Sequence, residues 1–128
     1  MYEFSITEDG YGEIQIDNFR ERFYPDFSFW SRADYYAHWR QASDALDAGQ
    51  AVSFIQCMYD PATSNFYQVW AAYPCNGEVI FQEQLLILDE IKADFNAQYM
   101  HLNAQPYEAV SEDGDPISEW RTQSNLSA

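Results

Sequence analysis

The residues best suited to chemistry are two histidines, His38 and His101, two cysteines, Cys57 and Cys75, and many carboxylates. None of them belongs to a recognisable catalytic pattern. The sequence contains no glycine-rich phosphate loop, no Cys-x-x-Cys pair, no His-Glu-x-x-His pair and no Gly-x-Ser-x-Gly turn. We therefore predict that the chain is not an enzyme and has no catalytic residues.

Two catalytic alternatives stay open from the sequence. Cys57 and His38 could meet as nucleophile and base, or two of the 21 Asp and Glu residues could serve as the acid and base of a small hydrolase. Cys57 has no basic residue within ten positions, whereas a reactive thiolate needs positive neighbours. His38 precedes Trp39 in a predicted helix, which favours a structural role.

A short acidic run near the C-terminus resembles part of a calcium loop. Glu112, Asp113 and Asp115 surround Gly114, but the remaining ligand positions of such a loop are missing. We interpret the run as a solvated loop and expect neither a metal nor a cofactor.

The charge of the chain limits its partners. Its 21 acidic and 6 basic side chains give a formal net charge of −15. Such a field repels nucleic acid and anionic membranes and attracts basic proteins, although acidity alone also fits plain solubility. The start Met1-Tyr2-Glu3 lacks the basic residues of a signal peptide, and no stretch approaches the ~20 apolar residues of a membrane span. The sequence predicts a cytoplasmic protein with a basic protein partner.

Aromatic residues are the second unusual feature of the composition. The chain has ten Tyr, nine Phe and four Trp, and a domain of this size has a limited interior, although a core rich in tyrosine is the alternative explanation. Tyr, Trp and Phe are enriched at the centres of protein interfaces. Some of these rings are therefore expected on a partner-binding surface.

The 128 residues are expected to form a single domain, 1–128, with frayed ends at 1–8 and 123–128. The clearest element is a helix over 31–49. Ser31 and Asp34 can cap its start, and Gly49 can end it. Its apolar residues recur on one face: Tyr35, Trp39, Ala42 and Leu46. A second helical stripe runs over 89–102.

Alternating and mixed apolar runs predict the strands. Three runs, 51–59, 66–73 and 78–88, are joined by short connections and predict an antiparallel meander. Asn76-Gly77 supplies the positive φ angles of its second turn. A last strand is predicted over 117–122, and two short strands around residues 4–6 and 14–16. The fold class is α+β: an antiparallel sheet of three-strand meander plus C-terminal strand, with one to two helices packed on it.

The meander separates the two cysteines. With Tyr59 opposite Phe66, Cys57 faces Gln68, and Cys75 lies more than ~20 Å along the next strand. A disulfide needs Cα atoms within about 4.4–6.8 Å. Both thiols are therefore expected to be reduced.

Several blocks of the chain, in this order, resemble the immunity proteins of bacterial contact-dependent growth inhibition systems. The blocks are Phe-Trp-Ser at 29–31, Tyr-Tyr at 35–36, Trp-Arg-Gln at 39–41, Val-Ser-Phe-Ile at 52–55, Phe-Tyr-Gln-Val-Trp at 66–70, Glu-Val-Ile-Phe-Gln-Glu-Gln-Leu at 78–85 and Pro-Ile-Ser-Glu-Trp at 116–120. The resemblance implies a cytosolic antidote that binds the C-terminal toxin domain of a delivered effector. Many such toxins are nucleases, whose substrate requires a basic surface.

Toxin contacts vary within this family, so the resemblance transfers no contact residue. From the charge pattern we predict that the toxin is bound by the acidic C-terminal segment and the tryptophan beside it: Glu112, Asp113, Asp115, Glu119 and Trp120. A nucleic-acid mimic that inhibits a DNA-binding protein is a further alternative. Its carboxylates should follow a phosphate-like spacing, whereas here they are scattered from Glu3 to Glu119.

Overall fold

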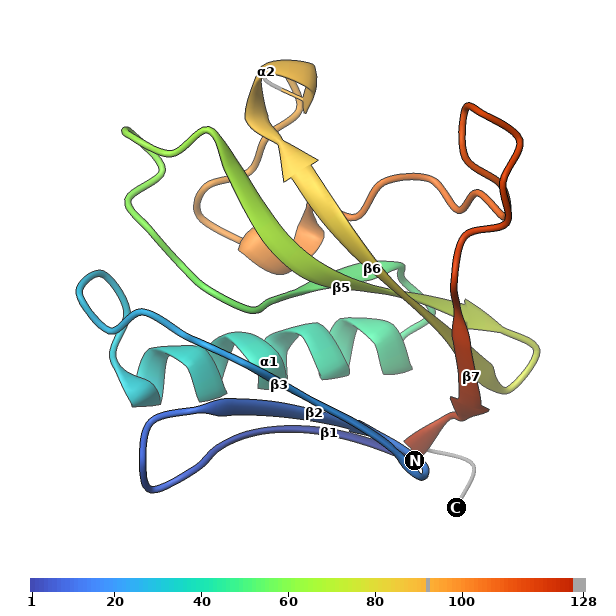
Figure 1. Cartoon of the computed structure of the whole chain (residues 1–128), viewed down its shortest axis with the longest axis horizontal. Helices are drawn as coiled ribbons and strands as arrows, with labels where there is room; N and C mark the ends of the chain where they lie inside the picture. The colour runs from blue at the N-terminus through green and yellow to red at the C-terminus, as the bar shows by residue number, and fades with distance from the viewer. Residues whose placement is uncertain (92, 126–128) are drawn as a thin grey trace.

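Two antiparallel sheets and one long helix make up the computed structural model, which describes residues 1–91 and 93–125 (Figure 1). The N-terminal sheet has the order β1-β2-β3, and the second sheet has the order β4-β5-β6-β7. The predicted α+β class, with a meander and a C-terminal strand, is confirmed. In chain order the elements are β1 (Tyr2–Ile6), β2 (Gly12–Ile16), β3 (Phe19–Phe23), α1 (Arg32–Asp47), β4 (Val52–Ile55), β5 (Phe66–Cys75), β6 (Glu78–Ile87), α2 (Leu88–Ile91), the 3-10 helix η1 (Met100–Leu102) and β7 (Trp120–Gln123).

The long helix forms where its sequence predicts it. The Ser31 hydroxyl accepts a hydrogen bond from the Asp34 amide, and the Asp34 carboxylate accepts one from the Ser31 amide, which completes a capping box. The helix ends at Asp47, and Gly49 adopts a φ of 95° two residues later. The four apolar residues predicted for its inner face are all buried: Tyr35, Trp39, Ala42 and Leu46.

Helix α1 also hydrogen-bonds backbone groups at the end of one edge strand in each sheet. On β4, His38 Nε2 accepts a hydrogen bond from the Ile55 amide, and Trp39 Nε1 donates one to the Ile55 carbonyl. On β1, the Tyr36 hydroxyl accepts from the Ile6 amide. These bonds give the backbone groups at the ends of two edge strands partners within the fold, where unpaired groups would be open to another chain.

The core lies between the two sheets and α1. Phe4 of β1 stacks on Phe54 of β4 at a ring-centroid distance of 4.3 Å, and Trp39 lies 5.6 Å from Phe4. Tyr2 contacts Phe81 of β6 edge-on at 5.1 Å. The N-terminal sheet therefore covers one face of the second sheet and is part of the same core.

This arrangement corrects the expectation of a frayed N-terminus at 1–8. Residues 2–6 form β1, in which the side chains of Tyr2, Phe4 and Ile6 alternate inward and are buried. At the other end, Gln123 closes β7 and the Ser124 amide bonds to the Gly77 carbonyl. The rest of the predicted frayed segment, 126–128, lies outside the described residues.

The predicted helix over 89–102 is wrong. Only α2 and the single turn η1 are helical, and the described residues 93–99 between them form turns and irregular chain. Asparagine side chains compete with helical bonding there. Asn103 accepts from the Asn96 amide and donates to the Asn96 carbonyl, and Asn96 accepts from the Tyr99 amide.

The strand boundaries also need correction. Strand β4 covers only 52–55 of the predicted 51–59, and β7 covers 120–123 in place of 117–122. The tight turn between β5 and β6 is confirmed, with φ of 52° at Asn76 and 82° at Gly77. The predicted register is wrong by one residue. Gln56, and not Cys57, lies opposite Gln68, and its amide donates a hydrogen bond to the Gln68 carbonyl. None of the described helices is long and apolar enough to cross a bilayer.

Both cysteines are free in this structure, as the register argument predicts. Thiol titration of the unreduced protein after denaturation should therefore find two reactive thiols per chain. A sample reduced before denaturation is the control and should give the same value. A titration that finds none without reduction contradicts the separation of the two strands.

Candidate functional site

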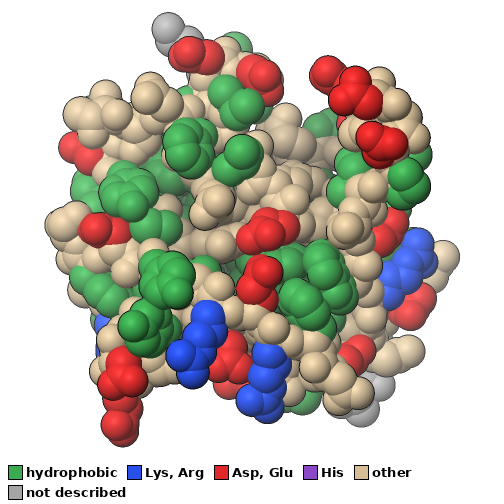
Figure 2. Space-filling view, in the orientation of Figure 1, with side chains coloured by type: hydrophobic (Ala, Val, Ile, Leu, Met, Phe, Trp, Pro, Cys, Tyr) green, Lys and Arg blue, Asp and Glu red, His purple; other side chains and the backbone are tan. Residues whose placement is uncertain are grey.

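The acidic residues predicted to bind the toxin divide into two groups in the structure. Glu112, Asp113 and Asp115 are all exposed on one projecting loop, which is closed by the Val110–Pro116 bridge. The Ser111 amide bonds to the Asp115 carbonyl at 2.8 Å across its base. The loop stands out from the body before the chain enters β7 (Figure 1), and acidic side chains gather at its tip (Figure 2).

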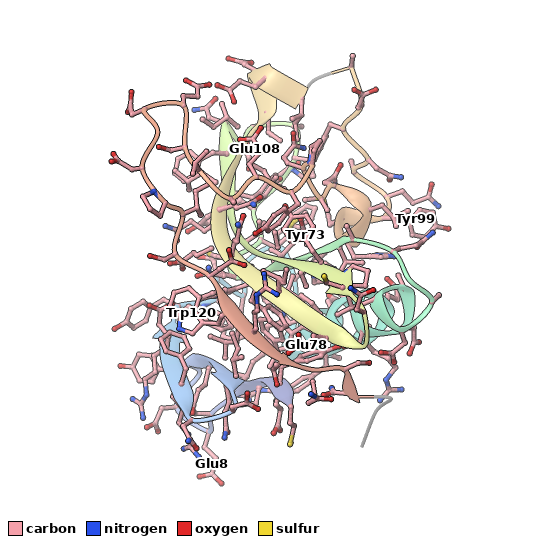
Figure 3. All side chains as sticks on the ribbon, turned by 90° about the vertical axis from the view of Figure 1, so that its right-hand side faces the viewer. Glu8, Tyr73, Glu78, Tyr99, Glu108 and Trp120 are labelled. Carbon is pink, nitrogen blue, oxygen red and sulfur yellow. The ribbon has the colours of Figure 1, made fainter. Side chains whose placement is uncertain are left out.

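Glu119 and Trp120 lie below this loop and have internal partners. Glu119 Oε1 accepts a hydrogen bond from the Tyr107 hydroxyl at 2.9 Å, and Oε2 lies 3.8 Å from the Arg121 guanidinium. The half-buried Trp120 packs on Phe19 at 4.6 Å, where β7 meets the N-terminal sheet (Figure 3). These two residues therefore help to hold β7 in place, and only part of their surface is open to a partner.

A second candidate site, which the sequence analysis missed, lies where the N-terminal sheet ends. The inner face of the β5–β6 hairpin is longer than the sheet that covers it. Near the hairpin turn this face is buried, with Trp70 and Phe81 fully enclosed. Toward the other end it is open, and Phe66, Leu85 and Ile87 are 53%, 54% and 41% exposed.

The open part of this face leads into a groove of about 690 Å³, here called the β3–β5 groove. Figure 2 shows acidic side chains near the centre of this side of the molecule, with hydrophobic patches on both sides of them. The groove is bounded by β3 with the residue after it, both ends of the β4–β5 connection, the first part of β5 and Glu83 of β6. It is lined by Glu21, Arg22, Phe23, Tyr24, Gln56, Cys57, Tyr59, Thr63, Ser64, Asn65, Phe66, Tyr67, Gln68 and Glu83.

Two carboxylates from different sheets, Glu21 of β3 and Glu83 of β6, line this groove. Partial burial and the negative charge of Glu83 together raise the pKa of Glu21 above its usual range. Glu83 is oriented by Gln56, a buried side chain whose Nε2 donates to Glu83 Oε2 at 2.8 Å. The ion pairs found among residues 1–91 and 93–125 involve other carboxylates, namely Asp17, Glu13 and Glu119.

Exposed aromatic rings stand beside these carboxylates. Tyr24 is 72% exposed and touches Tyr11 edge-on at 5.3 Å, while Tyr59, in the β4–β5 connection, is 49% exposed and also lines the groove. Arg22 lies over the Tyr11 ring at 5.6 Å. The excess of tyrosine in the composition was the available signal for such a surface, but it does not reveal which rings are exposed.

The histidines and Cys57 do not form the catalytic pair left open by the sequence. His38 is nearly enclosed, and its Nε2 lone pair is used by the Ile55 amide. Burial, together with the neighbouring His101, lowers the pKa of His38 to about 3. Such a weak base cannot take a proton from a thiol at neutral pH. Within the described part of the chain, no group of three or more His, Cys, Asp or Glu residues is arranged to hold a metal ion.

Fold and surface together define a small acidic α+β domain equipped for binding. The family model of the CdiI N-terminal domain matches residues 25–126, most of the chain. The chain therefore belongs to the CdiI family, the immunity proteins of contact-dependent growth inhibition.

The fold agrees with a solved structure from that group. The chain resembles one in the CdiA-CT/CdiI toxin and immunity complex from Enterobacter cloacae, with a TM-score of 0.83 and 23% sequence identity. The match covers 98% of this chain and 92% of the other. A search of curated proteins found no match.

Proposed function

We propose that this protein neutralises a cognate CdiA-CT toxin domain by binding it in the cytoplasm, without catalysis. Its membership of the CdiI family and its likeness to a chain from a CdiA-CT/CdiI toxin and immunity complex support this role. The partner is a basic domain with nuclease activity. The net charge of −15 carries this part of the proposal, because a nuclease must present positive charge to its phosphate substrate and an acidic inhibitor matches that surface.

The exposed acidic residues of the loop are the part of this charge best placed to attract the toxin domain. Glu112, Asp113 and Asp115 project from the body with no cation paired to them among the described residues. Charges at such a position guide an oppositely charged partner during approach and contribute less once contacts are buried. Glu119 and Trp120 then form the lower part of the same contact surface.

Protection and complex formation test the proposed function directly. Bacteria that express the cognate CdiA-CT toxin domain should stop growing, and co-expression of this chain should restore growth. The two purified proteins should form a complex on size exclusion. Purified toxin domain should degrade nucleic acid until this protein is added. A toxin domain whose growth inhibition is unaffected by this chain contradicts the proposal.

The rate of association should depend strongly on salt. Steering raises association rates by roughly 10–10³-fold, and the Debye length falls from about 10 Å at 0.1 M salt to about 3 Å at 1 M. Association with the cognate toxin domain should slow at least ~10-fold over this range, while dissociation changes less. Stopped-flow or surface plasmon resonance measures both rates. An association rate that does not change with salt contradicts electrostatic steering.

The same measurement locates the steering charges. Replacing Glu112, Asp113 and Asp115 by Gln, Asn and Asn should slow association and reduce its salt dependence. The matched control removes three charges elsewhere, through Glu8→Gln, Asp9→Asn and Glu3→Gln. If the control slows association as much as the loop variant, the whole field steers the partner and the loop has no special role.

A further inference from the structure

We propose that the β3–β5 groove receives an arginine side chain of the toxin domain, held between Glu21 and Glu83. This inference rests on the proposed function and adds to it a specific anchoring contact. It differs from the role of the acidic loop, because a residue enclosed in a groove controls how slowly the complex dissociates.

The shape of the groove favours a protruding partner. Beyond the edge of the N-terminal sheet, the inner face of β5 and β6 continues as an exposed apolar surface. In the strand register Phe66 lies opposite Ile87, and Leu85 lies opposite Gln68 at the next inward position. Contiguous exposed apolar surface next to a polar cavity marks sites of protein contact. The aliphatic part of a long side chain and its loop can cover this surface.

The groove lining carries two carboxylates against one guanidinium, that of Arg22, which lies over the Tyr11 ring at 5.6 Å, so its net charge favours a cation. Glu21 and Glu83 repel each other in the free protein, and the described residues provide neither with an ion-pair partner. Gln56 is almost fully buried and holds one oxygen of Glu83, which fixes that carboxylate toward the groove. A guanidinium placed between the two carboxylates would neutralise both and remove their repulsion.

The aromatic walls favour arginine over lysine. Tyr24, which follows β3, and Tyr59, in the β4–β5 connection, both line the groove and are 72% and 49% exposed. A guanidinium is planar, stacks on aromatic rings and donates to carboxylates from more than one edge, whereas an ammonium is a strongly hydrated point charge. Nucleic acid and anionic membranes are excluded from the groove because their phosphates would meet the two carboxylates.

The test compares dissociation from the cognate toxin domain for the wild type and for Glu21→Gln/Glu83→Gln. The double variant should bind at least ~30-fold more weakly, mainly through faster dissociation. The arginine would still be buried in the groove, but the two carboxylates that neutralise it would be gone. The matched control is Glu112→Gln/Asp113→Asn, which removes the same charge from the acidic loop. It should slow association and leave dissociation nearly unchanged.

Folding of the variant can be checked separately. Glutamine keeps the shape and the acceptor oxygen of each glutamate and removes the repulsion between them. The free double variant should therefore unfold at the same or a higher denaturant concentration than the wild type. Loss of toxin binding together with retained stability supports the groove assignment.

A cycle of substitutions identifies the occupant. Each arginine of the toxin domain is replaced by alanine and measured against wild type and double variant. One replacement should weaken binding to the wild type at least ~10-fold and have little further effect on the double variant. A lysine that behaves this way, or no coupled residue, overturns the assignment of arginine.

The proposed function and this inference fail differently. A wild-type protein that neither binds nor neutralises the toxin domain contradicts the proposed function. A wild-type protein that does both, while the groove variant dissociates at the wild-type rate, contradicts only the groove assignment.

Discussion

Replacing Trp39 by alanine is expected to lower the free energy of unfolding by about 3–5 kcal/mol, the usual cost of deleting a large buried aromatic side chain. The indole is 4% exposed and lies where α1, β1 and β3 meet. Its ring is 5.6 Å from Phe4 and 6.0 Å from Phe23. Its Nε1 also donates to the Ile55 carbonyl at 3.0 Å, so the substitution leaves a buried acceptor without its donor.

Denaturant unfolding measures this effect, with Arg40→Ala as the control. Arg40 is the next residue of α1, is exposed, and should change stability by no more than about 0.5 kcal/mol when truncated. A loss for Trp39→Ala as small as that of the control would show that the helix does not join the two sheets through this residue.

The elements that were predicted correctly have local causes. Helix α1 carries its own cap at Ser31 and Asp34 and a stripe of apolar residues at helical spacing. The β5–β6 hairpin has Asn76-Gly77 at its turn, where both residues need positive φ. In such segments the preferred local conformation and the native one agree.

The elements that were missed depend on distant contacts. Strand β3 has Arg20, Glu21 and Arg22 at its centre and shows no apolar alternation, so its strand state depends on pairing with β2. The segment after α2 has a helical stripe, but Phe95 is used to stack on Tyr67 at 6.2 Å in a non-helical chain. Tertiary contacts override local propensity at both places.

The two candidate binding surfaces also differ in whether local sequence or distant contacts create them. The acidic loop can be recognised from sequence because Glu112, Asp113 and Asp115 are neighbours along the chain. The groove cannot, because Glu21 and Glu83 belong to different sheets and approach only when the N-terminal sheet packs on the β5–β6 hairpin. Which distant carboxylates of this acidic chain come together therefore depends on how the two sheets pack.

Acidification from pH 7 to pH 5 should destabilise the wild-type protein through His38. Burial lowers its folded-state pKa to about 3, whereas an unfolded histidine has a pKa near ~6.5. Its contribution to stability is therefore complete above about pH 6.5 and is lost as the pH falls from there toward about 3. At pH 5 the unfolded chain binds this proton and the folded chain does not, which costs about 2 kcal/mol by linkage.

The His38→Gln variant isolates this contribution, because glutamine can still accept from the Ile55 amide and does not titrate in this range. His101 has a lowered pKa through burial and changes stability in the same direction, while the raised pKa of Glu21 acts in the opposite direction. Both groups remain in the variant, so the effect of Glu21 cancels in the comparison, and for His101 only its coupling to His38 is lost with the substitution. Denaturant unfolding at pH 7 and pH 5 should therefore show the wild type losing about 2 kcal/mol more than His38→Gln. Equal losses for the two proteins would mean that His38 is not held neutral by its burial between α1 and β4.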